Sequence, residues 1–203
     1  MLIAWCLKGV AESNSFSDAD AKAALNSAGL RATWLRNSNN AQSDLPSDTH
    51  WIMSQNALNA HVNSFGAAGV ATPYLSLAAG CRERLLAMGT YAVKTYPALK
   101  TALSFATNDG RNAGYVFHLW VLVGPKPAPH LPGFGEEVRS LLSSPQFAKY
   151  HHEGEIAAKL YVSARQIKSV TKFAADLSEV WLQPEQNPDF VPPEVINNVI
   201  ELV

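Results

Sequence analysis

The sequence predicts an α+β domain. Segments rich in branched and aromatic residues, which are typical of strands, recur along the chain without regular alternation with helices. The chain also contains no internal repeat. Its 203 residues, 47% of them hydrophobic, are enough for one substantial core. We therefore expect one domain over residues 1–180, followed by a proline-containing linker and a C-terminal helix over residues 181–203.

Helices are predicted where capping residues bracket an apolar pattern. Ser17 is suited to cap a helix that ends at Ala28, because Asp20 follows three residues later and Gly29 stands at the exit. Two consecutive prolines precede the last helix of the chain. The further helices are expected near Asp48–Val62, Ala98–Ala106, Phe134–Leu142 and Glu194–Leu202.

Strands are predicted from alternation and from branched or aromatic residues. Ala32–Arg36 alternates like a strand and ends in a cation, and a second strand carries the hydroxyl of Ser76 at its centre. A run of glycine and prolines after Val123 stops the longest strand. The core strands expected are Val70–Leu77, Tyr115–Val123, Glu153–Val162 and Ile167–Val170.

A pair of carboxylates, Glu153 and Glu155, opens one of these strands. Residues two apart on a strand share a face, so both carboxylates are expected to point into one cleft. Two glutamates at a strand entrance are also typical of a solvated edge that discourages edge pairing. The chemical interpretation depends on the arginine and the serine that precede the pair in the chain.

The order of arginine, serine and strand-borne glutamate pair resembles the mono-ADP-ribosyltransferase family, in the branch that includes bacterial toxin catalytic domains. Arg36 lies where this family places an arginine at the end of its first strand, and Ser76 lies where it places a Ser-Thr-Ser motif. Glu153 and Glu155 match the family's Glu-x-Glu. The resemblance covers roughly residues 30–173. It implies two packed, mainly antiparallel sheets around an NAD cleft, with flanking helices.

The resemblance also implies a role for each residue. Glu155 would stabilise the positive charge that develops on the ribose when the bond to nicotinamide breaks. Ser76 would orient that carboxylate, and Arg36 would bind the pyrophosphate through paired donors. Glu153 would face the incoming nucleophile. Tyr74 is expected to help bind NAD.

The loop before the glutamate pair carries Phe147 and Tyr150, where the family has a loop that helps to recognise the target. An exposed aromatic side chain there is suited to stack on an acceptor or on nicotinamide. Phe147 is equally suited to anchor the loop to the core. These two residues are the expected substrate-binding pair.

The sequence departs from the family pattern at two positions, because Leu77 and Ala78 replace the threonine and the second serine. Arg31 is an alternative to Arg36, since one sequence does not define the strand register.

The resemblance leaves three possible functions. The first is NAD-dependent transfer of ADP-ribose to a macromolecule, such as a protein arginine, in a toxin or effector. The others are an NAD glycohydrolase and a non-catalytic domain that has kept the fold.

Other classes find little support. A zinc-protease motif would need histidine at position 156, which is Ile156, so no metal is expected. A net charge of -1 provides no field that would gather nucleic acid or a membrane surface. Two cysteines indicate no disulfide framework, and the apolar start has no basic leader.

We expect a protein that is cytoplasmic or exported without a cleaved signal peptide. Its expected partners are NAD, an acceptor protein and an inhibitor or immunity protein.

Overall fold

The computed structural model describes residues 2–37, 53–68, 72–87, 90–123, 133–137, 154–193 and 199–200. The helical segments are α1 (Asp18–Ala23), the π-helical turn η1 (Ala24–Ala28), α2 (Thr33–Asn37), α3 (Gln55–Ala68), α4 (Ala98–Thr107) and the 3-10 turn η3 (Ala164–Gln166). The strands are β1 (Leu2–Ala11), β2 (Leu30–Arg31), β3 (Tyr74–Ala78), β4 (Cys81–Ala87), β5 (Thr90–Tyr96), β6 (Gly114–Val123), β7 (Phe134–Glu137), β8 (Glu155–Lys159), β9 (Tyr161–Val162), β10 (Ile167–Phe173), β11 (Glu185–Gln186) and β12 (Val199–Ile200).

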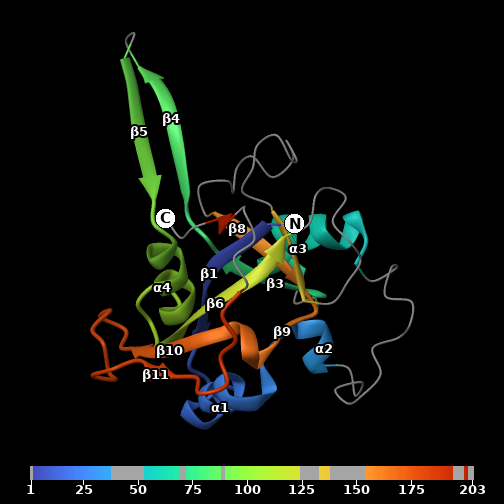
Figure 1. The fold of residues 1–203 in the computed structure, drawn as a ribbon, viewed down its shortest axis with the longest axis vertical. Helices are drawn as coiled ribbons and strands as arrows, with labels where there is room; N and C mark the ends of the chain where they lie inside the picture. The colour runs from blue at the N-terminus through green and yellow to red at the C-terminus, as the bar shows by residue number, and fades with distance from the viewer. Residues whose placement is uncertain are drawn as a thin grey trace.

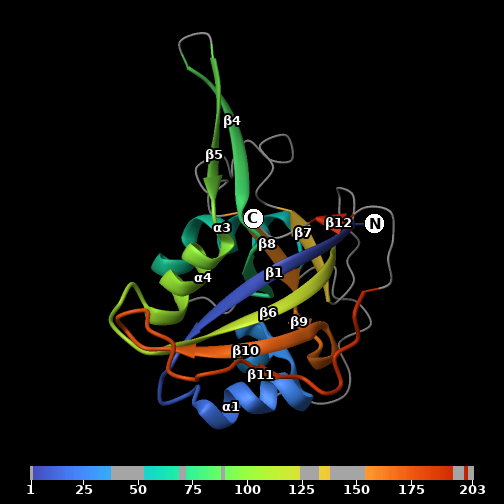
Figure 2. The same cartoon turned by 60° about the vertical axis from the view of Figure 1, so that its left-hand side comes forward.

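The main sheet closes on itself. β1 pairs antiparallel with β6 along its whole length and also contacts β3. β3 pairs with β8 and β8 with β7, both antiparallel, and β7 returns to β6 as a parallel neighbour. The strands β1, β3, β8, β7 and β6 therefore form a closed ring, and β10 with β11 extends the sheet beyond β6 (Figure 2). The pairings thus give one barrel-like sheet where two separate packed sheets were expected.

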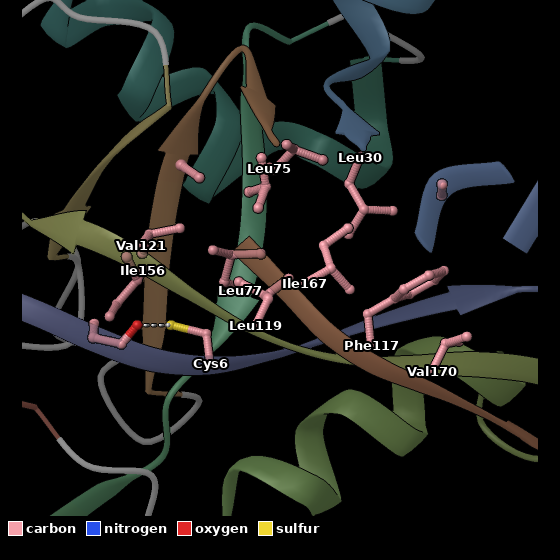
Figure 3. Close-up of a cluster of buried hydrophobic side chains, with 14 of the residues drawn as sticks. Cys6, Leu30, Leu75, Leu77, Phe117, Leu119, Val121, Ile156, Ile167 and Val170 are labelled. Carbon is pink, nitrogen blue, oxygen red and sulfur yellow. Dashed lines mark hydrogen bonds between the residues drawn. The ribbon is translucent and has the colours of Figure 1, made fainter. Parts of the chain in front are cut away.

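The core fills the interior of this ring. Cys6, Leu77, Leu119 and Ile156 come from four of its strands and are at most 1% exposed. Figure 3 shows these side chains converging between the strands. Each large aliphatic side chain buried in this way stabilises the fold by about 1.5–3 kcal/mol relative to its exposed state. The strands that carry the polar residues described below are therefore held by a tightly packed interior.

The first helix has the ends that the sequence predicts. The backbone N–H of Ser17 donates to Asp20 Oδ2 at 2.8 Å, and Gly29 ends the helical segment with φ of 67°. Positive φ is a conformation that glycine adopts without strain. The capped segment from Ser17 to Ala28 is confirmed as α1 followed by the π-helical turn.

A network of charged groups ties this helix to the sheet. The ammonium of Lys172 on β10 donates to Glu12 Oε1 and Asp18 Oδ1, both at 2.7 Å. The buried Tyr115 on β6 donates to the same two carboxylates, at 2.6 Å to Asp18 and 3.1 Å to Glu12. Hydrogen bonds from Lys172 and then Tyr115 lower the pKa of Asp18 from its usual 3.8. Asp18 in the first turn of α1 is therefore bonded to both β6 and β10, and Glu12, which precedes the helix, accepts from the same two groups.

Several predicted elements are confirmed. β6 and β10 cover the strands expected at Tyr115–Val123 and Ile167–Val170, and α4 covers the helix Ala98–Ala106. The strand expected over Val70–Leu77 is confirmed from Tyr74 onward, as β3. α3 begins at Gln55, later than the helix expected from Asp48, whose first residues lie outside the described part of the chain.

Other expectations are wrong. The segment Ala32–Arg36 is not a strand: Thr33–Asn37 is helix α2, in which the Arg36 N–H donates to the Ala32 carbonyl at 3.0 Å. Phe134–Glu137 is strand β7 rather than a helix, because β6 and β8 pair with its two edges. The long strand expected over Glu153–Val162 is divided into β8 and β9 at Leu160, whose φ is 62°.

Residues 185–187 of the C-terminal segment are bonded to the domain. β11 pairs with β10, and the Asn187 amide donates to the carbonyls of Ala164 at 2.8 Å and Ile167 at 2.9 Å. Val199–Ile200 pairs in parallel with the start of β1 as strand β12, so these two residues are not helical. Pairing with the edge of β1 thus determines the conformation of Val199 and Ile200, which their apolar character alone does not define.

A long hairpin of β4 and β5 projects from the body between β3 and α4 (Figures 1 and 2). It forms a two-stranded sheet of its own. This hairpin is not among the strands expected from the sequence. None of the helices in the described part of the chain has the length and apolar character needed to cross a membrane.

Candidate active site

A cavity of about 660 Å³ opens beside the strands that carry the predicted serine and glutamate. Its wall includes side chains from β1, α2, α3, β3 and β8, so elements distant in the sequence meet there. A cavity of this size is typical of small-molecule and cofactor sites. The polar residues in this wall that bear on the chemistry are Lys8, Arg31, Arg36, His61, Tyr74, Ser76 and Glu155.

Glu155 is the first residue of β8 and is 8% exposed. Its Oε1 atom is buried and has no hydrogen-bond partner among the described residues. His61 Nε2 lies 3.3 Å from that oxygen, which is ion-pair distance when the ring is protonated, although the two atoms do not form a hydrogen bond. A buried carboxylate oxygen without a hydrogen bond is unfavourable for folding, and such groups are typical of functional sites.

His61 on α3 connects the glutamate with the serine. Ser76 Oγ lies 2.9 Å from His61 Nε2, the same nitrogen that faces Glu155. The other ring nitrogen, Nδ1, lies 2.8 Å from Thr72 Oγ1. The residue types suggest a serine-hydrolase triad, but a triad needs the carboxylate on the nitrogen opposite the serine. Both groups share Nε2 here, so the geometry supports an oriented carboxylate and not an activated serine nucleophile.

Lys8 supplies a cation to the wall from the middle of β1. Burial lowers its pKa to about 8, while the charge of Glu155 acts in the opposite direction and that of Arg36 adds to the lowering. Among the described residues, no carboxylate lies within ion-pair distance of the Lys8 ammonium. An anionic ligand in the cavity would favour its charged form.

Two arginines lie at the same cavity. Arg36 is exposed on α2, where its Nη2 donates to Thr33 Oγ1 at 3.2 Å, and Arg31 is half-buried on β2. Both remain candidates for a contact with an anionic substrate. The expected reason for choosing Arg36, its position at a strand end, is wrong because the residue is helical.

A turn at Gly154 precedes the glutamate. Its φ is 63°, so Gly154 itself is not in an extended conformation. Because Glu153 is not among the described residues, the shared face expected for the glutamate pair stays a prediction. The Ala79 N–H donates to the Gly154 carbonyl at 2.8 Å, which joins this turn to the end of β3. A Cβ at position 154 would lie 2.4 Å from backbone atoms of Gly80, so only glycine fits. Glu153, Phe147 and Tyr150 lie outside the described residues.

Sequence reasoning missed Lys8 and His61. A signal for Lys8 exists, because it is the only charged residue in the apolar run Leu2–Ala11. His61 lies beside Leu58 and Val62 on the buried face of α3, where a histidine is usually a core residue. Nothing in the sequence indicates that this face meets Ser76 and Glu155. Among the described residues, no group of three or more His, Cys, Asp or Glu side chains is arranged to hold a metal ion.

Comparison with known proteins rests on structure alone. No protein-family model matches the sequence, and no curated protein matches it either. The fold is similar to EcPltA, with a TM-score of 0.52 and 11% identity over 98% of this chain and 93% of that chain. An arginine-to-lysine mutant of heat-labile enterotoxin gives a TM-score of 0.50 and 12% identity over 96% of this chain and 81% of that one.

A guanine-specific ADP-ribosyltransferase is also similar, with a TM-score of 0.47 and 12% identity over 96% of this chain and 82% of the other. Identities this low concern the fold and leave function open. The structural neighbours confirm that the chain has an ADP-ribosyltransferase-like fold, as the sequence predicted.

Proposed function

We propose that this protein is an NAD-dependent mono-ADP-ribosyltransferase of the toxin or effector type, which transfers ADP-ribose to a macromolecule. The observation that carries the proposal is the buried Glu155 oxygen without a hydrogen bond, in a cavity that also contains Ser76 and a cation. A buried carboxylate beside a ribose would stabilise the positive charge that develops on the ring in the transition state. NAD supplies the ADP-ribosyl group, and its nicotinamide is the leaving group.

The serine and the histidine position the glutamate. Ser76 Oγ and Glu155 Oε1 both face His61 Nε2, at 2.9 and 3.3 Å, so the three groups restrict one another's rotation. The geometry of a catalytic carboxylate has to be held within a fraction of an ångström to be effective. His61 thus contacts both Ser76 and Glu155, and we expect it to help position the carboxylate in the absence of the two further hydroxyls of the family motif.

Lys8 is the residue that we expect to contact the pyrophosphate. The resembling family places an arginine at the end of its first strand, whereas Lys8 lies in the middle of β1, the first strand of this chain, and lines the same cavity as Glu155. An ammonium attracts a phosphate as a point charge but does not form the bidentate pair of a guanidinium. Arg36 and Arg31 then provide further positive charge at the same cavity.

The acceptor is proposed to be a protein, with arginine as a candidate residue and Glu153 as the group that faces it. Phe147 and Tyr150 stay the predicted acceptor contacts, and an inhibitor or immunity protein stays a predicted partner. A cytoplasmic location, or export without a cleaved signal peptide, is likewise part of the proposal.

The test is NAD consumption by the full chain and by the Glu155→Gln variant. Because the amide keeps the shape and removes the charge, we expect turnover to fall by about 100-fold to 1000-fold. The variant should be at least as stable as the natural protein in urea unfolding, since a buried anionic oxygen without a hydrogen bond is removed. Glu179→Gln, at an exposed glutamate, is the matched control and should retain activity.

The product identifies the reaction. Label from the adenylate part of NAD on a macromolecule would support the transferase, whereas free ADP-ribose alone would make the protein an NAD glycohydrolase. If the full chain neither binds nor consumes NAD, the protein is a non-catalytic domain with this fold. Equal turnover by Glu155→Gln would refute the site.

A further inference from the structure

We propose that Thr72 is a positioning residue that fixes the tautomer of His61, so that Nε2 is the ring nitrogen presented to Ser76 and Glu155. The catalytic part of this inference rests on the proposed function. The tautomer itself can be tested without any substrate.

Thr72 is 3% exposed and precedes β3 by two residues. Its Oγ1 lies 2.8 Å from His61 Nδ1 and donates to the Tyr74 carbonyl at 3.3 Å. A hydroxyl has one hydrogen to donate and two lone pairs to accept with. In the proposed assignment the threonine hydrogen points to the Tyr74 carbonyl, which can only accept, rather than to His61.

This assignment decides the state of the histidine. With its hydrogen directed at the Tyr74 carbonyl, Thr72 Oγ1 is an acceptor toward His61, so Nδ1 has to carry a proton. In a neutral imidazole the other nitrogen is then an acceptor. Nε2 therefore presents a lone pair to the cavity and accepts from the Ser76 hydroxyl, which lies 2.9 Å away.

A proton on Nε2 would reverse the direction of this contact. The protonated ring donates at both nitrogens, so Nε2–H would point to Ser76 Oγ or to Glu155 Oε1, which lies at 3.3 Å. The Ser76 hydrogen would then be released toward the carboxylate or a ligand. Thr72 thus ensures that any proton exchange of this histidine occurs at the cavity side.

The backbone around Thr72 is well suited to hold it in place. Its carbonyl accepts the Trp34 N–H of α2 at 3.1 Å, and the carbonyl of the following Pro73 accepts the Leu160 N–H at 2.7 Å. α2 carries Arg36, and Leu160 directly follows β8, which carries Glu155. The same short segment is therefore bonded to the elements that carry both groups. This arrangement fixes the threonine relative to the whole site.

The first measurement is the tautomer, read from the ring nitrogen resonances of ¹⁵N-histidine protein by NMR. The resonances of His61 are assigned as those that are missing from the spectrum of the His61→Gln variant. We expect the Nδ1–H form in the natural protein and in Thr72→Ser, which keeps the hydroxyl. Thr72→Val has the same shape without the acceptor, so we expect it to populate the Nε2–H form.

The matched control is Thr107→Val. Thr107 is fully buried on α4, where its hydroxyl donates to the Leu103 carbonyl at 2.8 Å and accepts from the Gly110 N–H at 3.1 Å. Both threonines thus lose one donated and one accepted hydrogen bond on substitution. Thr107→Val should leave the His61 signals unchanged, and so separates the tautomer effect from a general loss of stability.

The second measurement is steady-state NAD consumption. We expect Thr72→Val to lower kcat by about 10-fold to 100-fold, the usual range when the partner that orients a ligating or catalytic histidine is removed. KM should change less than twofold, because no contact with the substrate is lost. Thr72→Ser should restore kcat.

An Nε2–H tautomer in the natural protein would overturn the inference, as would a Thr72→Val spectrum that keeps the Nδ1–H form. If Thr72→Val does not fold, the spectrum of the natural protein alone decides between these outcomes. A protein that consumes no NAD but shows the expected tautomers would contradict the proposed function and leave the role of Thr72 intact.

Discussion

The partly buried lysine of β1 leads to a prediction about stability. Lys8→Met keeps the length of the side chain and removes a charge from the cavity wall, and we expect it to stabilise the protein at neutral pH. Burial lowers the pKa of Lys8 from 10.5 to about 8. At about 1.4 kcal/mol per pH unit, that difference corresponds to about 3 kcal/mol against the charged form. Because part of the side chain remains exposed, we expect a gain of about 1–3 kcal/mol.

The sign of the pH dependence follows from linkage. The unfolded chain holds the Lys8 proton more tightly than the folded chain, so between pH 8 and pH 10.5 the natural protein gains stability relative to the variant as pH rises. Below pH 8 the lysine is charged in both states, and the full difference is present. The advantage of Lys8→Met should therefore be greatest at pH 7 and shrink through pH 10.

Urea unfolding of both proteins at several pH values between 7 and 10 measures this difference. Lys100→Met, at an exposed position on α4, is the control and should change stability by less than about 0.5 kcal/mol at every pH. A Lys8→Met variant that is less stable than the natural protein at pH 7, or a difference that does not vary with pH, would refute the interpretation. Loss of NAD binding in the stabilised variant would show that the Lys8 ammonium contributes to ligand binding at the expense of stability.

Two further predictions concern the framework of the site. Gly154→Ala should destabilise the protein by about 2 kcal/mol or more in urea unfolding, because its Cβ would lie 2.4 Å from the Gly80 backbone at a φ of 63°. Gly110→Ala also has positive φ but meets only one atom, at 3.4 Å, so it should cost about 1 kcal/mol; equal effects would contradict the close approach. Lys172→Met should lower stability at pH 7 by about 1–2 kcal/mol, because the ammonium bonds two carboxylates. Since its bonds lower the pKa of Asp18, this contribution is present above pH 3.8 and is lost as pH falls further; a loss that persists after acid titration would refute the assignment.

The sequence by itself determined those elements whose signals are local. The helix from Ser17 needs only its capping residues and its exit glycine, which lie within the same short segment. β6 and β10 are rich in branched and aromatic residues, and such residues favour strands wherever a sheet receives them. The order of arginine, serine and glutamate in the chain was also enough to suggest the fold that the structural neighbours confirm.

Only the tertiary structure decided the conformation of segments without strong local signals. Phe134–Glu137 is a strand because β6 and β8 pair with its two edges, and Thr33–Asn37 is a helix although its residues alternate. Pairing with a distant strand adds hydrogen bonds and burial that outweigh a weak local preference. A single sequence does not reveal which distant strand will be available.

The site was decided in the same way. Ser76 and Glu155 were visible as candidates in the sequence, whereas Lys8, a single charge in an apolar segment, and His61, on the buried face of a helix, were not among the candidates. Their importance comes from their neighbours across the cavity, which the pairing of β1, β3 and β8 brings together. Residue type is a property of the chain, whereas the distance between a carboxylate and an imidazole exists only after the strands have closed around the core.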